Sequence, residues 1–335
     1  MKKPINIGIV GCGNIVNRHI AAIKNHKKLK LSAVCDQRKE RADMIANANR
    51  CKAYYDYSQM VKDRNIDLLS ICTPSHLHAL MTILAAKNKK HIITEKPIAL
   101  TLKDARNMIG ICKKEKVKLF VVNQRRFNWA IQKTCSAIKK KKLGKILMAN
   151  VALRWSRPQS YYNEEKWRRK ENTGGGVLLN QAVHFIDFLQ WFCGEPSKLF
   201  AVTRTLNHDI QAEDSAIATL FFKNGTIGSL EATTSIFGKN MEASITLIGE
   251  KGTIKIGGNY ADKIVFWNVK NDPESTKISK ADTPSSGHTA FYGEVYKELV
   301  GKKSSVSIDG EESLKSLKII LACYKSAKLS KLIKI

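Results

Sequence analysis

Apolar, β-rich runs alternate with helix-like segments through the first third of the chain, and this alternation most constrains the fold. The runs occupy residues 5–10, 31–35, 68–72, 91–94 and 118–122, and the helix-like segments occupy residues 15–24, 38–48, 77–87 and 102–114. Such alternation is typical of right-handed β-α-β crossovers, in which helices cover both faces of a parallel sheet. The sequence therefore predicts an α/β protein that begins with a Rossmann-type parallel sheet.

A glycine-rich turn follows the first run and opens the first helix. Gly11 permits a tight turn, and Gly13 lets the backbone approach a pyrophosphate at the helix N-terminus, beside Asn14 and Ile15. Asp36 ends the second run, 23 residues beyond Gly13. Its carboxylate is placed to accept hydrogen bonds from ribose hydroxyls and to repel a 2′-phosphate. We expect the cofactor to be NAD rather than NADP.

Polar residues follow the third and fourth runs. Thr73 and Pro74, with His78 shortly after, come at the carboxyl edge where open α/β sheets bind ligands. The alternative for this segment is an ordinary helix start with solvated imidazoles. Lys96 stands at the end of the fourth run, which is a suitable place for a catalytic lysine, and the Lys96–Pro97 peptide is a candidate for the cis isomer.

The pattern changes from about residue 123. Short β-rich segments occupy residues 146–155, 198–205, 215–222, 226–233, 241–248, 253–256 and 264–267, and Asn224-Gly225 predicts a type I′ hairpin. These segments predict a large, mostly antiparallel open sheet in an α+β domain, covered by helices on one face and by a further subunit on the other. We expect a nucleotide-binding domain over residues 1–122 and a substrate-binding and oligomerisation domain over residues 123–335.

Three successive glycines at 174–176 open a segment, residues 177–192, that is apolar nearly all round and so is expected to be a buried helix. Asn180, His184 and Asp187 fall on one face of that helix. Because buried polar groups need partners, this stripe indicates a lined cleft. The alternative is a core histidine satisfied by its neighbours.

The chain has 335 residues and a formal net charge of +28. Its lysines are spread along helix faces and turns, with no basic arm or nucleic-acid motif, so we expect no nucleic-acid partner. No run is long and apolar enough for a membrane span, and the first apolar stretch is too short for a signal peptide. The eight cysteines form no C-x-x-C pair and no zinc-type spacing. A cytoplasmic enzyme without a metal is expected.

The motifs together resemble the glucose-fructose oxidoreductase, inositol dehydrogenase and MocA family. They are Gly-Cys-Gly-Asn-Ile at 11–15, Cys-Thr-Pro at 72–74, Glu-Lys-Pro at 95–97, Arg126-Phe127, Trp167-Arg168, the triple glycine, and His184 with Asp187. The resemblance implies hydride transfer between nicotinamide and a ring carbon of a sugar or cyclitol. It also implies cofactor contacts from Glu95, Lys96, Gln124, Trp167 and Arg168, and a homodimer or homotetramer formed through the second-domain sheet.

Family members commonly have Asp where this chain has Asn180, so the acid/base work is expected to fall on Lys96 and His184. A similar asparagine occurs in the subgroup that oxidises C3 of UDP-N-acetylglucosamine or its uronic acid. We therefore expect a nucleotide-sugar substrate, bound by Lys96, Asn180 and His184 together with Arg125, Arg157 and Tyr161. The alternatives are a dehydrogenase of a free sugar or cyclitol, an NAD-dependent glycosidase, and an inactive NAD-binding sensor.

Overall fold

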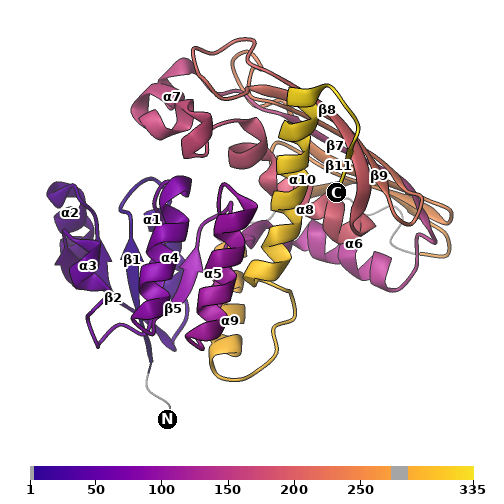
Figure 1. Cartoon of the computed structure of the whole chain (residues 1–335). Helices are drawn as coiled ribbons and strands as arrows, with labels where there is room; N and C mark the ends of the chain where they lie inside the picture. The colour runs from indigo at the N-terminus through magenta and orange to yellow at the C-terminus, as the bar shows by residue number, and fades with distance from the viewer. Residues whose placement is uncertain (1–3, 273–285) are drawn as a thin grey trace. The chain divides into compact units, whose positions relative to one another are not determined.

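The computed structural model describes residues 4–272 and 286–335, and the chain divides into two compact units (Figure 1). The first unit comprises residues 1–124 and 284–314, and the second comprises residues 125–283 and 315–335. This division differs from a single boundary after residue 122, because a late segment returns to the first unit. Within that segment α9 (Ser286–Leu299) packs against α1 (Val16–Lys24), and the Ile308 carbonyl accepts a hydrogen bond from the Val121 N–H.

The first unit is built on a six-stranded parallel sheet in the order β3-β2-β1-β4-β5-β6. Its strands are β1 (Ile5–Val10), β2 (Leu29–Cys35), β3 (Lys52–Tyr54), β4 (Leu68–Ile71), β5 (His91–Thr94) and β6 (Leu119–Val121). The predicted Rossmann-type sheet is confirmed. The sequence pattern missed β3, which is only three residues long and presents Lys52 to solvent.

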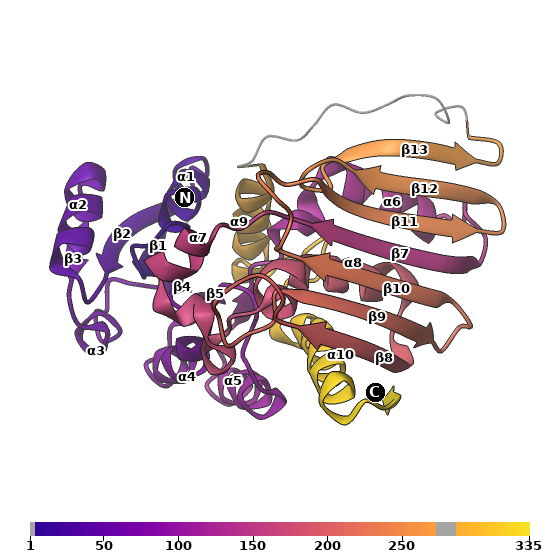
Figure 2. The same ribbon diagram turned by 90° about the horizontal axis from the view of Figure 1, so that it is seen from above.

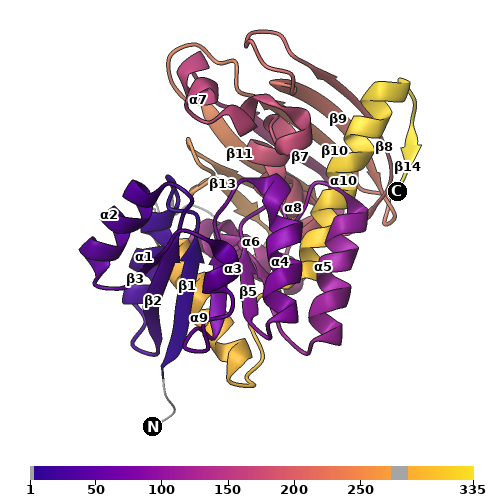
Figure 3. The same ribbon diagram turned by 60° about the vertical axis from the view of Figure 1, so that its left-hand side comes forward.

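Helices cover both faces of this sheet (Figure 2). They are α1, α2 (Lys39–Asn49), α3 (Tyr57–Met60), α4 (His78–Lys87), α5 (Leu102–Lys114) and α9, with a short 3-10 turn, η1 (Ser75–Leu77). The strand order reverses between β1 and β4, so right-handed crossovers place α1 and α2 on one face and α4 and α5 on the other. Figure 3 shows α4 and α5 side by side.

The second unit is built on an eight-stranded sheet in the order β13-β12-β11-β7-β10-β9-β8-β14 (Figure 2). Its strands are β7 (Ile146–Arg154), β8 (Pro196–Arg204), β9 (Ser215–Phe222), β10 (Ile227–Thr233), β11 (Glu242–Gly249), β12 (Gly252–Gly257), β13 (Lys263–Val269) and β14 (Ile333–Lys334). Among the described strands only the β7–β10 pair is parallel, so the expected mostly antiparallel sheet is confirmed.

Three longer helices, α6 (Trp129–Lys139), α8 (Val183–Cys193) and α10 (Gly310–Leu329), lie on one face of this sheet (Figures 1 and 2). The strands alternate accordingly: Leu220 and Leu230 are fully buried, whereas Ile217 is 64% exposed on the other face. The smaller elements are α7 (Gln159–Glu164) and the short turns η2 (Gln124–Phe127), η3 (Lys166–Arg169), η4 (Glu171–Thr173) and η5 (Val177–Ala182).

The β9–β10 connection is not the predicted type I′ turn. That turn requires positive φ at both central residues, and Asn224 is not among the described non-glycine residues with positive φ. Instead, the Gly225 N–H donates to the Phe222 carbonyl, and Gly225 itself has a φ of 87°. A three-residue loop that ends in a left-handed glycine therefore joins the strands.

Candidate functional site

The glycine turn after β1 has the conformation that the sequence predicts. Gly11 has a φ of 96°, and a Cβ atom there would lie 2.7 Å from the Cys72 carbonyl oxygen, so only glycine fits. A Cβ added at Gly13 would meet no atom within 4 Å. In the part of the chain that the structure describes, no side chain caps the N-terminus of α1, which begins directly after Asn14 and Ile15. The turn thus presents backbone and a helix terminus to open space, as a dinucleotide pyrophosphate requires.

Asp36 lies at the end of β2 and closes the same turn. One carboxylate oxygen accepts the Cys12 N–H at 2.8 Å, and the other accepts the Arg38 N–H at 2.9 Å. Each carboxylate oxygen has a second lone pair. Asp36 can therefore hold the turn while still accepting a hydroxyl hydrogen bond from a ribose.

The side-chain amide of Gln124 is further evidence that a cofactor binds at the carboxyl edge of the parallel sheet. Gln124 follows β6, and its Oε1 atom is buried without a hydrogen-bond partner in the described residues. Buried polar oxygens rarely stay unsatisfied, so this atom calls for a donor from a bound molecule, such as an amide. Together with the open space at Gly13, it indicates that the residues of the first unit fit NAD.

His78 connects the loops that follow β4 and β5. Its Nδ1 lies 2.9 Å from the Pro97 carbonyl oxygen and its Nε2 lies 3.0 Å from the Thr73 carbonyl oxygen. Burial lowers the pKa of His78, which favours the neutral ring. Both ring nitrogens face carbonyl oxygens, and the neutral ring donates to only one of them. The contact at the Pro97 carbonyl lies directly after the Lys96–Pro97 peptide, which is cis as the sequence suggested. A direct role for His78 at the cofactor stays a prediction.

Asn180 and His184 lie on consecutive parts of the helix after the triple glycine. Residues 177–182 form a π-helical turn that contains Asn180, and α8 then continues with His184, which is buried. π-helical turns are frequent at functional sites. Asp187, one turn further, is instead satisfied by Arg126, whose guanidinium binds it through two hydrogen bonds. The polar stripe is therefore split between a structural ion pair and the two candidate substrate ligands.

The triple glycine approaches protein atoms rather than leaving room for a ligand. A Cβ at Gly175 would collide with the Arg168 carbonyl oxygen, and one at Gly176 would collide with the Glu213 carboxyl group. Glu213 Oε1 also accepts the Leu178 N–H and the Tyr324 hydroxyl, each at 2.9 Å. Burial raises the pKa of Glu213 to about 7. This carboxyl group, which the sequence pattern did not reveal, anchors the start of the π-helical turn.

Arginines and aromatic rings gather in the second unit. The Arg157 guanidinium lies 4.9 Å from the Trp155 ring centroid and 5.5 Å from that of Tyr161, and it donates to Gln181 Oε1. Gln181 Nε2 in turn donates to the Tyr161 hydroxyl at 2.9 Å. The structure thus brings together the predicted Arg157 and Tyr161. Gln181 was not predicted, although it is the immediate neighbour of Asn180.

The other predicted residues of this unit are tied to the same aromatic groups. Arg168 lies 4.1 Å from the Tyr161 ring centroid, donates to the Tyr161 carbonyl, and lies 5.7 Å from the Trp167 ring. Arg125 donates to the Tyr260 carbonyl and lies 5.7 Å from the Trp155 ring. Arg125 and Arg157 are half-buried and Arg168 is buried. Arginines that lie against aromatic faces can bind anionic or planar ligands.

Family models cover nearly all of this chain. One described as "Oxidoreductase family, NAD-binding Rossmann fold" matches residues 5–123, and one described as "Oxidoreductase family, C-terminal alpha/beta domain" matches residues 136–335. The chain belongs to this oxidoreductase family. It is an NAD-dependent sugar oxidoreductase, and the family resemblance drawn from the motifs is confirmed.

Solved structures and curated relatives fit this membership. The WlbA dehydrogenase from Bordetella pertussis, in complex with NADH and UDP-GlcNAcA, is 35% identical with a TM-score of 0.95 over 100% of this chain and 99% of that one. The WlbA dehydrogenase from Chromobacterium violaceum, with the same ligands, is 32% identical with a TM-score of 0.93 over 100% and 97% of the two chains. Myo-inositol 2-dehydrogenase from Thermotoga maritima is 29% identical over 80% of both chains.

Proposed function

We propose that the protein oxidises a ring carbon, C3, of a UDP-N-acetylamino sugar such as UDP-GlcNAc or its uronic acid. The observation that carries this proposal is the full-length similarity to two dehydrogenases solved with UDP-GlcNAcA, at 35% and 32% identity. The half-buried Arg157, lying against Trp155 and Tyr161, supports it, because such a surface can bind the diphosphate and the base of a nucleotide sugar.

Lys96 and His184 share the acid/base work in this proposal. Oxidation of a CH–OH group removes a hydride from carbon and a proton from the hydroxyl oxygen. Bound NAD supplies the hydride acceptor. One of the two side chains takes the hydroxyl proton, and the other stabilises the charge that develops on the oxygen. Asn180 holds a sugar hydroxyl but takes no proton. The Lys96→Met variant should lose roughly 10²- to 10⁴-fold in turnover while NAD binding persists.

The residues predicted from the sequence to contact the cofactor are part of the proposal. We assign the cofactor to Gly11, Gly13, Asn14, Ile15, Asp36, Thr73, Pro74, His78, Glu95, Lys96 and Gln124 of the first unit and to Trp167 and Arg168 of the second. In this proposal residues 1–122 act as the nucleotide-binding domain, joined by the returning segment that contains α9, and the rest of residues 123–335 serves substrate binding and oligomerisation.

A homo-oligomer formed through the second sheet is part of the proposal. The sheet face away from α6, α8 and α10 exposes large apolar side chains, among them Ile217, Met148 and Phe200 at 64%, 51% and 40% exposure. Exposed apolar side chains gathered on one face of a sheet support an interface with a second copy of the chain. Among the described residues no helix is long and apolar enough to cross a membrane. All eight cysteines are free thiols, which supports a reducing compartment such as the cytoplasm.

A dehydrogenase of a free cyclitol is the second candidate, favoured by the 29% identity to a myo-inositol 2-dehydrogenase. A thermal-shift screen with NAD present separates the two. UDP-GlcNAc or its uronate should raise the melting temperature by several degrees at saturation, and free N-acetylglucosamine and myo-inositol should not.

The Arg157→Gln variant should lose the shift produced by the UDP-sugar. The matched variant Arg204→Gln, at an exposed arginine of the same unit, should keep it. Stabilisation by myo-inositol alone would overturn the proposal in favour of the cyclitol enzyme.

A further inference from the structure

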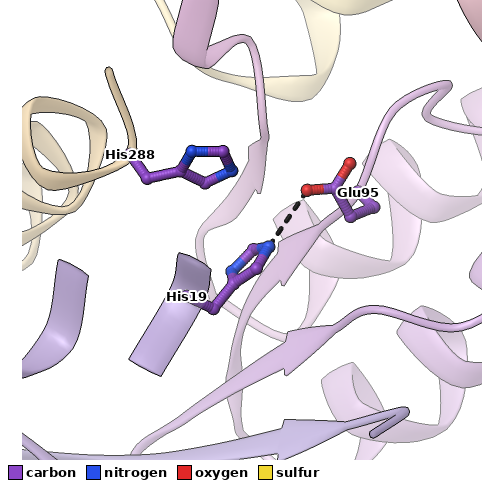
Figure 4. A group of neighbouring side chains, drawn as sticks. All are labelled: His19, Glu95 and His288. Carbon is purple, nitrogen blue, oxygen red and sulfur yellow. Dashed lines mark hydrogen bonds and ion pairs between the residues drawn. The ribbon is translucent and has the colours of Figure 1, made fainter. Parts of the chain in front are cut away.

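A buried polar network in the first unit ends beside Lys96, and Figure 4 shows two of its members, His19 and Glu95. His19 projects from α1, Glu95 follows β5, and Tyr292 projects from α9, while Ser70 belongs to β4. His19, Ser70 and Tyr292 are completely buried, and Glu95 is 9% exposed. Four separate elements thus supply one cluster, none of whose members apart from Glu95 was singled out by the sequence.

The hydrogen-bond contacts of the network form a continuous series. Tyr292 Oη lies 2.9 Å from His19 Nδ1 and donates to Ser70 Oγ at 3.1 Å. His19 Nε2 lies 3.0 Å from Glu95 Oε1. The other carboxylate oxygen, Oε2, accepts the backbone N–H of Lys96 at 3.2 Å. The chain of contacts therefore runs from Tyr292 through His19 and Glu95 to the peptide that carries Lys96.

The charges along the network favour an ion pair. Burial would raise the pKa of Glu95, but the hydrogen bond and charge of His19, with the charges of Lys96 and His288, lower it to about 2. Burial would lower the pKa of His19, but Cys72, Tyr292 and Glu95 raise it well above its usual value. The imidazolium of His19 thus balances the carboxylate that faces Lys96.

The same side chains could instead be considered for a metal ion, since His19, Glu95 and His288 each offer a ligand atom (Figure 4). Their ligand atoms lie within 4.8 Å of one another. His19 and Glu95 contact each other directly and balance their own charges. The ion pair accounts for the cluster better than a metal does.

We propose that His19 and Tyr292 are positioning residues for Lys96: through Glu95 they fix the peptide from which the lysine extends and set the net charge beside its ammonium group. The inference rests on the proposed function, because there Lys96 acts on the substrate. Loss of the His19 charge leaves the Glu95 carboxylate without its imidazolium partner and stabilises the ammonium form of Lys96. Loss of the Glu95 charge has the opposite effect.

The titratable groups that face the network come from several elements: Cys72 after β4, His78 on α4, His288 and Tyr292 on α9, and Lys96 itself. Variants that change only His19 or Glu95 leave these groups in place. Glutamine suits both positions, because its amide can retain a hydrogen bond at the site of His19 Nε2 or of a Glu95 oxygen.

The test is the pH dependence of Lys96 acylation by acetic anhydride, measured by peptide mass spectrometry on the full chain with NAD present. In His19→Gln the midpoint for Lys96 should move up by at least about half a pH unit, and in Glu95→Gln it should move down by a similar amount. Tyr292→Phe should act like His19→Gln but more weakly. Tyr296→Phe, one turn further along α9, is the matched control and should leave the midpoint unchanged.

The inference is wrong if the pH midpoint of Lys96 acylation is the same in all variants as in the unmodified protein. It is also wrong if that midpoint moves in the same direction in His19→Gln and Glu95→Gln. So does a stoichiometric metal in the purified protein that is lost in both variants, because it would make the cluster a metal centre. The kcat/KM profile of each variant on the best sugar supplies the second readout. If the Lys96 midpoints shift in opposite directions but the unmodified protein shows no dehydrogenase activity, the proposed function is wrong and this inference stands. If the unmodified protein oxidises the sugar but the midpoints do not shift in this way, only this inference is wrong.

Discussion

Arg126 and Asp187 form a bidentate ion pair inside the second unit, with Nε to Oδ2 at 2.6 Å and a terminal nitrogen to Oδ1 at 2.7 Å. The two side chains are 0% and 1% exposed. The Arg126 guanidinium also lies 4.6 Å from the Trp191 ring centroid. The pair joins the start of the unit to α8, the helix that carries His184, and so holds that helix in place.

Removal of the charge of Asp187 should therefore destabilise the fold. Asp187→Asn leaves the Arg126 guanidinium buried without its counter-ion, and loss of one partner of a buried pair costs about 3–5 kcal/mol. Asp209→Asn is the control, because Asp209 pairs with Arg169 but is 88% exposed, and surface pairs contribute about 0–1 kcal/mol. Urea unfolding of both variants measures the difference. A cost for Asp187→Asn as small as that of the control would show that the pair is not structurally required.

Glu213 should make the stability of the protein depend on pH. Its pKa is about 7 in the folded chain against an ordinary value of 4.5, so between these two values the folded state binds more protons than the unfolded state. The contribution of Glu213 to the free energy of unfolding is therefore complete below about pH 4.5 and is lost as the pH rises to about 7. The loss is at most about 3 kcal/mol.

Glu213→Gln removes this titration and keeps an oxygen that can accept the Leu178 and Tyr324 hydrogen bonds. Relative to the unmodified chain, the variant should gain stability on going from about pH 5 to about pH 8, as followed by urea unfolding at each pH. Glu195→Gln, at an exposed carboxylate of the same unit, should show no such gain. Equal pH profiles for Glu213→Gln and the unmodified chain would contradict a neutral Glu213.

Much of the first unit could be predicted because its signals are local. Gly11 directly follows a strand, and the tight turn that requires its positive φ involves only neighbouring residues. The order of the strands follows from the alternation of strands and helices and from the right-handedness of their crossovers. The return of α9 to α1 could not be predicted, since it depends on contacts between residues nearly the whole chain apart. The β9–β10 turn was misread because Asn224-Gly225 is compatible with more than one hairpin loop.

In the second unit, contacts between residues far apart in the sequence likewise could not be predicted around the candidate site. His184 and Asn180 were predicted from their spacing on one apolar helix. The partner of Asp187, however, lies 61 residues earlier in the chain, and the side chain packed against Gly176 is that of Glu213. Helical periodicity gives no sign of such partners. Nor does it reveal a π-helical turn at residues 177–182, whose extra residue per turn changes which side chains share a face.

Cofactor choice should respond to Asp36. Asp36→Ala removes the carboxylate that repels a 2′-phosphate, so the preference for NAD over NADP should narrow, as measured by kcat/KM with each cofactor. The turn should loosen as well, because Asp36 also accepts the Cys12 N–H. Equal use of NAD and NADP by the unmodified enzyme would contradict this role for Asp36.

His184→Asn discriminates a catalytic histidine from a core one. Asparagine suits a wet polar site, so a catalytic His184 should give a loss of turnover of at least about a hundredfold with a change of only a few degrees in melting temperature. A packed core histidine should instead cost about 1–3 kcal/mol, with near-normal turnover per folded molecule. Measurement of both quantities on the one variant decides between them.

The most direct test of the account is the rate of NADH formation, followed at the absorbance band of the reduced nicotinamide, with UDP-GlcNAc, its uronic acid, the corresponding free sugars and myo-inositol as substrates. We expect kcat/KM for one of the UDP-sugars to exceed that for its free sugar by at least about a hundredfold, since that ratio corresponds to only about 2.7 kcal/mol of binding to the nucleotide. The Lys96→Met variant should abolish most of that rate. Faster oxidation of a free sugar or of myo-inositol than of either UDP-sugar would contradict the account.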